Sequence, residues 1–272
     1  MKVVAYLGPE ATFSHQAAVA HYGKSALFRS ADCIEDVFSL VEKGVCSHGV
    51  VPVENSYEGS VNITFDLFYT YETILCAEIF LRIRHHLLSR AEKMEDITRL
   101  YSHSQALAQC RSWIKTNLPG IPTSEVASTS FAAKMAADDS ESAALGRKYA
   151  AKIHGLKVLA EGIEDHPDNM TRFLAIGKSR SEPTGKDKTS LLFLLNHQPG
   201  ALHSSLGLLA DKGINMTRIE SRPMRSRNWE YMFFVDIEGH EKDRDIAEAL
   251  DEMRSRCLFL KVLGSYPCGV EP

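Results

Sequence analysis

Residues 168–177, DNMTRFLAIG, place a hydroxyl and a guanidinium side by side at the start of an apolar strand. An Asp-Asn pair is typical of a turn, and Thr, Phe and Ile suit a pleated strand, so the segment alone fits a purely structural role. The same two side chains could also do chemistry. Thr171 can donate a proton or a hydrogen bond to a substrate oxygen, although no Ser-His-Asp partnership supports it as a nucleophile. Arg172 can bind a carboxylate through two parallel hydrogen bonds, with Lys134 or Arg147 as substitutes.

Four further polar segments lie at strand ends or at the start of predicted helices. They are GPEATFS (8–14), ENSYEGSV (54–61), SHSQ (102–105) and STS (128–130). Each alone reads equally well as a helix cap or a polar loop, but helix N-termini also have spare N–H donors that attract carboxylates. Together with Thr171 and Arg172 they predict a polar cleft for a small ligand with several carboxylates. The candidate binding residues are Thr12, Ser14, Asn55, Ser56, Glu58, Gly59, Ser60, Ser104, Gln105, Ser128 and Thr129.

The elements that must position these residues alternate between strands and helices, which favours an α/β fold with parallel strands. Strands are predicted at 3–7, 48–55, 98–102, 122–127 and 171–176. Helices are predicted at 14–22, 32–44, 61–70, 105–117, 130–137 and 141–153. The extended segment 72–90 can carry the chain into a second lobe, and the strand at 171–176 can return it. Two lobes would then face a cleft, which is a favoured place for a ligand.

Residues 178–190, KSRSEPTGKDKTS, contain no large apolar side chain and predict a linker. The pattern after it changes to strand, helix, strand, strand, helix, strand in about 80 residues, which is the ferredoxin-like order. A helix that starts at Gly200 and a strand that ends at Pro223 belong to this second part. A core helix and an edge strand explain both features without any ligand.

Length and composition narrow the classes of protein further. The 272 residues predict about two domains, and a net charge of −4 gives no reason to expect a nucleic-acid partner. The apolar run near the N-terminus is too short for a signal peptide or a membrane span. Six scattered cysteines without zinc spacing predict a reduced, cytoplasmic protein. Because neighbours on a strand face opposite ways, the pair His85-His86 does not predict a metal site.

The ordered motifs resemble those of single-activity prephenate dehydratases with a C-terminal ACT domain. GPEATFS, NSYEGSV, SHSQALAQC, STSFAA, SAAL and NMTRF carry the resemblance in the first part, and GALHSSL and ESRP carry it in the second. The resemblance covers roughly residues 2–266. Ala11 stands where the family often has Gly, and Ser104 where it often has Pro. Both departures change loop backbone preferences and leave the polar side chains in place.

The resemblance implies a catalytic domain over residues 1–180, similar to type 2 periplasmic binding proteins, whose second lobe spans about 80–160. It implies a linker at 181–188 and a ferredoxin-like ACT regulatory domain at 189–272. The implied reaction converts prephenate to phenylpyruvate, water and carbon dioxide in L-phenylalanine biosynthesis, with no cofactor and no metal. Thr171 would be the acid, Arg172 would belong to the anion-binding apparatus, and Phe173 would complete the motif that borders the active site.

The resemblance further implies that L-phenylalanine inhibits the enzyme from a site between the ACT domains of two subunits, in a homodimer or homotetramer. That site would comprise Gly200, Ala201, Leu202, Asn215, Glu220, Ser221, Arg222 and Pro223. Two alternatives stay open. An arogenate dehydratase performs the same elimination on an amine-bearing substrate, and a noncatalytic amino-acid sensor could use the same two-lobed cleft. The Thr171-Arg172 pair argues against the sensor.

Overall fold

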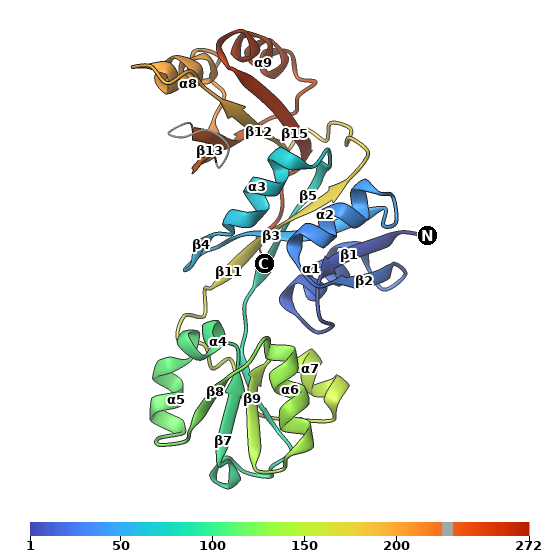
Figure 1. Ribbon diagram of the computed structural model, residues 1–272, viewed down its shortest axis with the longest axis vertical. Coiled ribbons are helices and arrows are strands. Elements are labelled where there is room, and N and C mark those ends of the chain that lie inside the picture. Colours follow the sequence, from blue (N-terminus) through green and yellow to red (C-terminus); the bar gives the residue numbers. More distant parts are fainter. Residues whose placement is uncertain (225–230, 272) are drawn as a thin grey trace.

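The computed structural model describes residues 1–224 and 231–271 and has three units stacked along its long axis (Figure 1). Lobe 1, residues 1–82 and 170–180, lies in the middle. Lobe 2, residues 86–161, lies at one end, and the C-terminal domain, residues 187–271, lies at the other. The expected two lobes and separate C-terminal unit are therefore present.

Lobe 1 is built on a mixed sheet with the strand order β2-β1-β3-β11-β5, and β4 lies beside β3. The strands are β1 (Val3–Leu7), β2 (Leu27–Ala31), β3 (His48–Asn55), β4 (Gly59–Ser60), β5 (Ile74–Arg82) and β11 (Met170–Gly177). The first three are parallel, as predicted, whereas β11 runs antiparallel between β3 and β5, so the parallel strands make up only part of the sheet. The helices are α1 (Phe13–Tyr22), α2 (Ile34–Glu42) and α3 (Asn62–Thr70).

Lobe 2 has a second mixed sheet with the order β10-β6-β9-β7-β8. Its strands are β6 (His86–Ser89), β7 (Arg99–Ser102), β8 (Thr123–Glu125), β9 (Ser142–Gly146) and β10 (Lys157–Glu161). The helical segments are η1 (Met94–Asp96), α4 (Ser104–Gln109), α5 (Arg111–Asn117), α6 (Thr129–Asp138) and α7 (Lys148–His154). The helix predicted over 105–117 is interrupted at Cys110.

The predicted helix over 141–153 is wrong in its first half. Residues 142–146, SAALG, form β9 in the middle of the sheet, and all five are buried. Alanine and leucine favour helices, but pairing with β6 and β7 outweighs that local preference. The outer strands β2 and β10 were not predicted at all.

Two adjacent chain segments join the lobes. Residues 83–85 leave β5 for β6, and residues 162–169 return from β10 to β11, which confirms the predicted crossing within 72–90. The segments bond to each other, since the Ile83 amide donates to Asn169 O at 2.8 Å and the Ile163 amide donates to His85 O at 3.0 Å. They form a narrow paired hinge.

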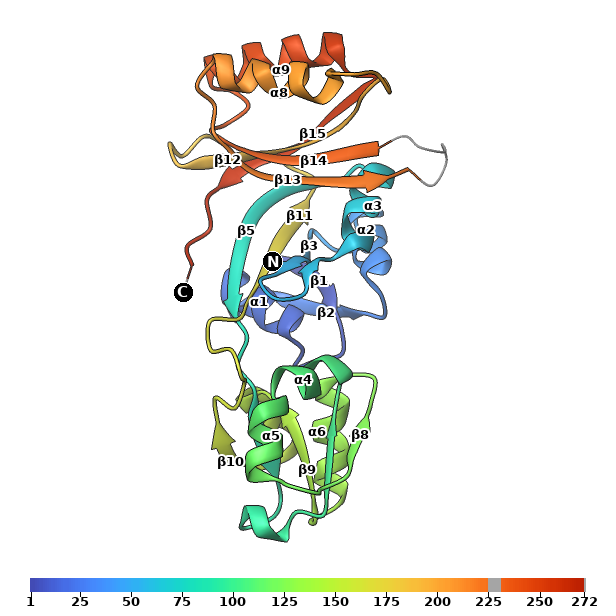
Figure 2. The same ribbon diagram turned by 90° about the vertical axis from the view of Figure 1, so that its left-hand side faces the viewer.

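The C-terminal domain has the predicted βαββαβ order. It comprises β12 (Asp187–Leu194), α8 (Ala201–Asp211), β13 (Met216–Pro223), β14 (Tyr231–Glu238), α9 (Arg244–Arg256) and β15 (Phe259–Pro267). The four strands form an antiparallel sheet in the order β13-β14-β12-β15. Both helices cover the outer face of the sheet, and its inner face meets lobe 1 (Figure 2). Strand β12 begins inside the segment predicted as a linker.

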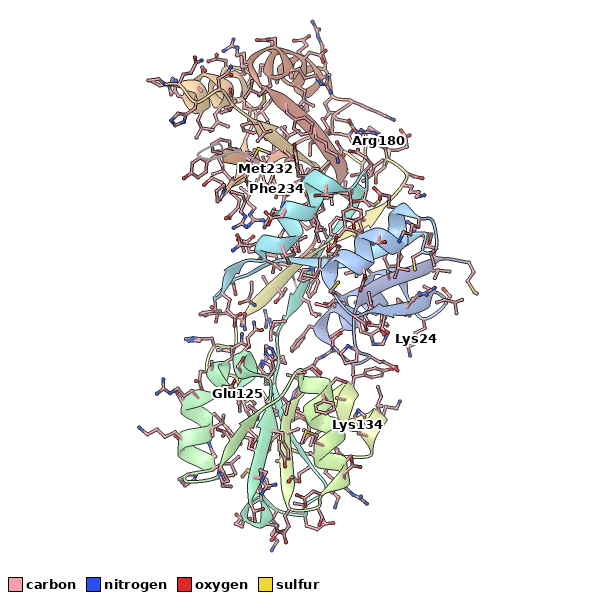
Figure 3. All side chains as sticks on the ribbon, in the orientation of Figure 1. Lys24, Glu125, Lys134, Arg180, Met232 and Phe234 are labelled. Atoms are coloured by element: carbon pink, nitrogen blue, oxygen red, sulfur yellow. The ribbon has the colours of Figure 1, made fainter. Side chains whose placement is uncertain are left out.

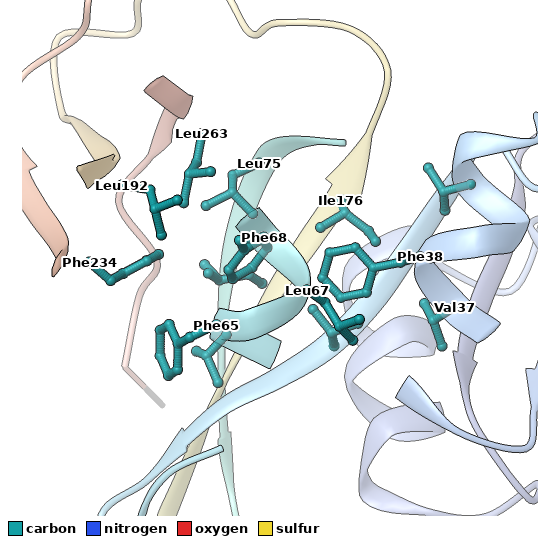
Figure 4. Close-up of a cluster of buried hydrophobic side chains, with 14 of the residues drawn as sticks. Val37, Phe38, Phe65, Leu67, Phe68, Leu75, Ile176, Leu192, Phe234 and Leu263 are labelled. Atoms are coloured by element: carbon teal, nitrogen blue, oxygen red, sulfur yellow. The ribbon is translucent and has the colours of Figure 1, made fainter. Parts of the chain in front are cut away.

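Lobe 1 and the C-terminal domain share one hydrophobic core. Phe65, Phe68 and Leu75 of lobe 1 pack with Leu192 and Phe234 of the C-terminal sheet (Figure 4). Phe234 and its neighbour Met232 lie on the sheet face turned toward α3 (Figure 3). A side chain at Gly264 would place its Cβ 2.3 Å from the Leu75 carbonyl oxygen, so glycine permits β15 to approach β5 closely. Among the described residues, no helix has the length and apolar character needed to cross a membrane.

Candidate active site

The two lobes enclose a cleft of about 400 Å³. Nearly all the predicted binding residues line it: Thr12, Ser14, Asn55, Glu58, Gly59 and Ser60 from lobe 1, and Gln105, Ser128 and Thr129 from lobe 2. Thr171 and Phe173 line it from β11. The apolar part of the wall includes Phe13 and Pro52. No arginine or lysine is found among these described lining residues, so the cleft presents hydroxyl and amide groups, the rings of His85 and His103, and a single carboxylate, Glu58.

The Thr171 hydroxyl is oriented by Asn55. Asn55 Oδ1 accepts hydrogen bonds from the amides of Tyr57 (3.0 Å) and Glu58 (3.1 Å), which fixes Nδ2 on the opposite side. Nδ2 is then shared among Thr171 Oγ1 at 2.9 Å, Asn169 Oδ1 at 2.8 Å and Met170 O at 3.1 Å. Because Thr171 Oγ1 accepts from Asn55, its own hydrogen is left to be donated into the cleft.

Two helices begin at the cleft from opposite lobes. The Thr12 hydroxyl caps α1 by accepting from the His15 amide at 3.3 Å, and the Ser128 hydroxyl caps α6 by accepting from the Phe131 amide at 3.0 Å. The Thr12 hydroxyl also donates to Leu7 O at 2.9 Å, so the backbone takes both of its hydrogen-bonding roles, whereas the Ser128 hydroxyl keeps its hydrogen to donate. The spare amides of each first turn and the positive end of each helix dipole favour negative charge in the cleft.

Glu58 connects the lobes across the cleft. It accepts hydrogen bonds from the side-chain amides of Gln105 and Gln109, the second at 3.1 Å. Gln109 Oε1 must then face His85 Nε2, 2.8 Å away, which makes Nε2 the protonated nitrogen of that ring. Burial lowers the pKa of His85, so the ring is neutral near pH 7. The side chains thus form one chain of hydrogen bonds from lobe 1 to the hinge.

Sequence reasoning missed three polar residues of this wall: His85, His103 and Gln109. His103 caps α4, since its Nδ1 accepts from the Gln105 amide at 3.3 Å. Both His103 and Gln109 lie within the motif SHSQALAQC, but only Gln109, four positions after Gln105, has the helical spacing that could have indicated it. His85 was considered only as half of a metal pair.

Ser56 and Ser104 do not line the cleft. The Ser56 hydroxyl accepts from the Met170 amide at 3.0 Å and donates to Asn169 Oδ1 at 3.4 Å, which fastens the end of β3 to the start of β11. Ser104 is an exposed first residue of α4, one position beyond the capping His103. The structure thus gives Ser56 a local structural role and leaves Ser104 at the surface.

The structure contradicts the predicted contact between Arg172 and a substrate carboxylate. Alternation along β11 turns Thr171 and Phe173 into the cleft and Arg172 to the opposite face. There its guanidinium pairs with Glu78 Oε1 at 2.6 Å and with Asp236 Oδ2 at 2.7 Å. The substitute Lys134 is exposed on α6 (Figure 3). Arg147 is buried behind α1, where its guanidinium donates to Thr12 O and burial lowers its pKa to about 10.

The predicted effector residues are divided between two faces of the C-terminal sheet. A pocket of about 130 Å³ beside the start of α8 includes Ala201, Leu202, Tyr231 and Phe233. Gly200 caps α8 in the left-handed conformation, with φ 80°. The other predicted residues do not appear among the described residues that line this pocket. They are Asn215 and, on β13, Glu220, Ser221, Arg222 and Pro223.

The pairing of β13 with β14 explains this division. Ser221 and Pro223 pair with Phe233 and Tyr231, so they share the face of the effector pocket. Glu220 and Arg222 point the other way, toward lobe 1. Glu220 accepts from the Ser60 hydroxyl at 2.6 Å, and Arg222 pairs with Asp66 at 3.3 Å.

The chain was compared with the profiles of known protein families and with known proteins. The sequence profile of the family described as prephenate dehydratase matches residues 4–181. The chain belongs to the prephenate dehydratase family. A second profile, that of the ACT domain, matches residues 189–254, so the C-terminal domain is an ACT domain. Both parts of the resemblance are confirmed.

Individual relatives cover nearly the whole chain. The bifunctional chorismate mutase/prephenate dehydratase of Aquifex aeolicus is 47% identical over 97% of this chain and 73% of its own length. The prephenate dehydratase of Arthrobacter aurescens, solved in complex with L-Phe, aligns with a TM-score of 0.90 and 34% identity over 97% of this chain and 90% of that one. GqqA, described as a novel type of quorum quenching acylase, aligns with a TM-score of 0.90 and 30% identity over 98% of both chains.

Proposed function

We propose that this chain converts prephenate to phenylpyruvate, water and carbon dioxide in the cleft between its lobes. The observation that carries the proposal is the Thr171 hydroxyl, which lies in the cleft and accepts from Asn55 so that it can donate to a ligand. Family membership supplies the substrate. The cleft supplies a donor for the leaving group and neutral groups for two carboxylates.

The reaction needs no separate oxidant. The bond between the ring and its carboxylate breaks, and its electron pair enters the ring as carbon dioxide departs. The ring becomes aromatic and expels its hydroxyl, which takes the Thr171 proton and leaves as water. Solvent then restores that proton. A free Thr hydroxyl is a weak acid, so the preorganised cleft must stabilise much of the developing charge.

The two carboxylates of prephenate fit the positive ends of α1 and α6. Backbone amides near Ser14 and Thr129 would bind them from opposite lobes, so that substrate binding draws the lobes together. The rings of Phe13 and Phe173 offer an apolar wall for the substrate ring. Substrate recognition would then rest on neutral donors and shape, with no guanidinium contact.

The deciding experiment supplies purified full-length protein with prephenate and arogenate separately and identifies the products. Phenylpyruvate from prephenate supports the proposal. Turnover of arogenate alone would replace it with arogenate dehydratase, and a well-folded protein that binds phenylalanine but converts neither substrate would be an amino-acid sensor.

We also propose that L-phenylalanine inhibits the enzyme through the ACT domain. The pocket at Ala201 and Leu202 is small in one chain, and β13 pairs only with β14 among the described residues, so its free edge can meet a second copy. A homodimer or homotetramer formed through ACT domains would complete the site. We propose residues 1–180 as the catalytic domain of a cytoplasmic protein. The regulatory domain expected at 189–272 begins two residues earlier, at Asp187, because β12 begins there, which shortens the expected linker of 181–188 to 181–186.

A further inference from the structure

Behind the strand that carries Thr171 lies a buried charge cluster, defined here as Arg172, Glu78, Lys188 and Asp236. Arg172 and Glu78 belong to lobe 1, whereas Lys188 and Asp236 belong to the ACT domain. Arg172 pairs with both carboxylates, and Lys188 Nζ lies 3.0 Å from both oxygens of Glu78. Two cations therefore balance two carboxylates across the domain boundary.

Hydroxyl groups fix the orientation of this cluster. Arg172 Nη2 donates to Tyr266 OH at 3.3 Å, the Tyr266 and Ser190 oxygens lie 2.6 Å apart, and Ser190 donates to Asp236 Oδ1. Burial raises the pKa of Tyr266 well above its usual range, so its phenol stays protonated. The four side chains thus close a ring in which three members belong to the ACT domain.

Because the side chains of this ring are buried, each must keep its hydrogen-bond and ion-pair partners. Asp236, Ser190 and Tyr266 are 0% exposed, and Arg172 is 7% exposed. Water cannot replace a lost partner there, and removing one member leaves an uncompensated group at high cost. The Arg172 side chain must therefore follow the ACT sheet if that sheet shifts.

Arg172 is the immediate neighbour of Thr171 on β11, on the opposite face. The register shift in the pairing of β11 with β3 lies on β3, where Val53 is the extra residue, and β11 pairs with β5 without a break from Met170 to Ala175. The backbone of β11 is therefore regular here, and Thr171 and Arg172 share one peptide unit. The position of Thr171 in the cleft thus follows the position of the Arg172 backbone.

We propose that Arg172 is a positioning residue through which the ACT domain sets the placement of Thr171 in the cleft. The inference rests on the proposed function and deepens it, since it names the residue that links effector binding to turnover. A shift of the ACT sheet moves the Arg172 side chain with it, and through the β11 backbone it changes the distance from the Thr171 hydroxyl to the leaving oxygen.

A second contact, between strand β13 of the ACT domain and Ser60 of the cleft wall, also links the ACT domain to the cleft. Strand β13 carries Ser221 and Pro223 on the effector side and Glu220 on the lobe 1 side, where Glu220 accepts from Ser60 of the cleft wall. Arg218 donates to the same Ser60 hydroxyl at 2.8 Å. Phenylalanine can shift turnover only if it binds one arrangement of this sheet better than another. Strand β13 contacts the cleft wall directly and pairs with β14, whose Tyr231 and Phe233 line the effector pocket.

The test compares full-length wild type with three variants. Asp236→Asn keeps the shape and removes one counter-ion of Arg172. Arg172→Met with Asp236→Leu removes the link entirely, yet leaves Glu78 paired with Lys188 and Tyr266 bonded to Ser190. Asp66→Asn is the matched control, because it also removes a carboxylate that pairs with the ACT domain, but from α3 and outside the charge cluster. Each protein is assayed for kcat, KM, half-inhibition by phenylalanine, and hydrogen exchange of residues 168–177.

We expect Asp236→Asn to lower kcat by about 10- to 100-fold with KM nearly unchanged, since misplacing a reacting group by about 1 Å can cost about 100-fold. We expect the double variant to bind phenylalanine by calorimetry, but to need at least about fivefold more for half-inhibition, which is the low end of typical coupling. Phenylalanine should change exchange at 168–177 in the wild type and in Asp66→Asn, and not in the double variant.

Folded variants with wild-type kcat and a wild-type phenylalanine response would overturn the inference. If Asp236→Asn does not fold, the double variant decides by the same criteria. A wild type that converts no prephenate fails the proposed function instead. In that case the exchange measurement still decides this inference, because a phenylalanine-dependent change at 168–177 that persists in the double variant contradicts it.

Discussion

Lobe 1 meets its two neighbours in different ways. Toward lobe 2 its contacts are mostly single hydrogen bonds around a cleft, such as Glu58 with Gln109 and the Ser130 hydroxyl with Glu10 O. Toward the ACT domain it shares a hydrophobic core that includes Phe65 and Phe234, together with a buried charge cluster. The boundary between lobe 1 and lobe 2 is thus polar and is crossed by a narrow hinge of two chain segments. The boundary between lobe 1 and the ACT domain resembles the interior of one domain.

This difference indicates where the molecule can move. Water can replace the exposed bonds to Glu58 at little cost, so the cleft can open and close around a substrate once the bonds of buried Ser130 and Arg147 to lobe 1 are also broken. The ACT boundary cannot open without exposing aromatic side chains and separating buried charges. We therefore expect the ACT sheet and lobe 1 to move as one body during turnover, with effector signals passing as small shifts.

The largest expected effect is on the cleft side of β11. Thr171→Ala removes the only side-chain group that we assign as an acid, and general acid help is worth about 100- to 10,000-fold in rate. We expect kcat to fall by that range while the thermal midpoint stays near wild type, measured by phenylpyruvate formation and thermal unfolding. Thr171→Ser keeps the hydroxyl and should retain more activity. Near-native turnover in folded Thr171→Ala would remove Thr171 from the mechanism.

The next largest expected effect is a loss of stability on replacing Arg172, which lies on the opposite face of β11. Arg172→Met leaves Asp236 buried without its cation, which costs about 3–5 kcal/mol in free energy of unfolding. Gln105→Ala is the comparison at the polar boundary, because exposed Gln105 donates to Glu58, and it should cost only about 0.5–1.5 kcal/mol. Urea unfolding measures both. Equal losses would contradict the distinction between the two boundaries.

Arg172→Lys separates our account from the sequence-based expectation. A substrate contact predicts a raised KM, whereas the structure predicts loss of stability with KM nearly unchanged, because Lys lacks the planar fork with which Arg172 binds Glu78 and Asp236 through separate nitrogens. Initial rates over a range of prephenate concentrations decide. A large rise in KM in a stable variant would restore Arg172 to the cleft.

Much of this site follows from the sequence alone. Polar segments after β1, β3 and β7 and before α6 identified most of the cleft wall, because strand ends and helix starts meet at the same edge. The placement of Arg172 needed one further step. Neighbouring residues on a strand face opposite ways, and this rule puts Thr171 and Arg172 on opposite faces just as it separates His85 from His86. Because Thr171 and Arg172 belong to one motif, both were nevertheless predicted to lie in the active site.

Other features depend on distant parts of the chain. The partner of Arg172 is Asp236, which lies 64 positions later and has no local signal of its own. The alanine-rich β9 is a strand only because β6 and β7 flank it. The linker at 178–190 correctly marked a change of domain, but its composition gave no indication that the two domains share a core.

The smallest expected effect is on the dependence of stability on pH. Burial lowers the pKa of His15, His48 and His85 from the usual 6.5. Their stabilisation is therefore present above about pH 6.5 and is lost as pH falls, because the unfolded chain takes up protons first. For each histidine, lowering the pH to 5.5 reduces the free energy of unfolding by at most about 1.4 kcal/mol. Urea unfolding at pH 7.5 and 5.5 measures the change, and a protein more stable at pH 5.5 would contradict it.

The most direct test of the account is a crystal structure of the Thr171→Ala variant with prephenate bound. We predict prephenate between the lobes, with its ring hydroxyl beside position 171, its carboxylates at the N-termini of α1 and α6, and Arg172 still paired with Glu78 and Asp236. Prephenate bound outside this cleft, or Arg172 withdrawn from the charge cluster to hold a substrate carboxylate, would contradict the account.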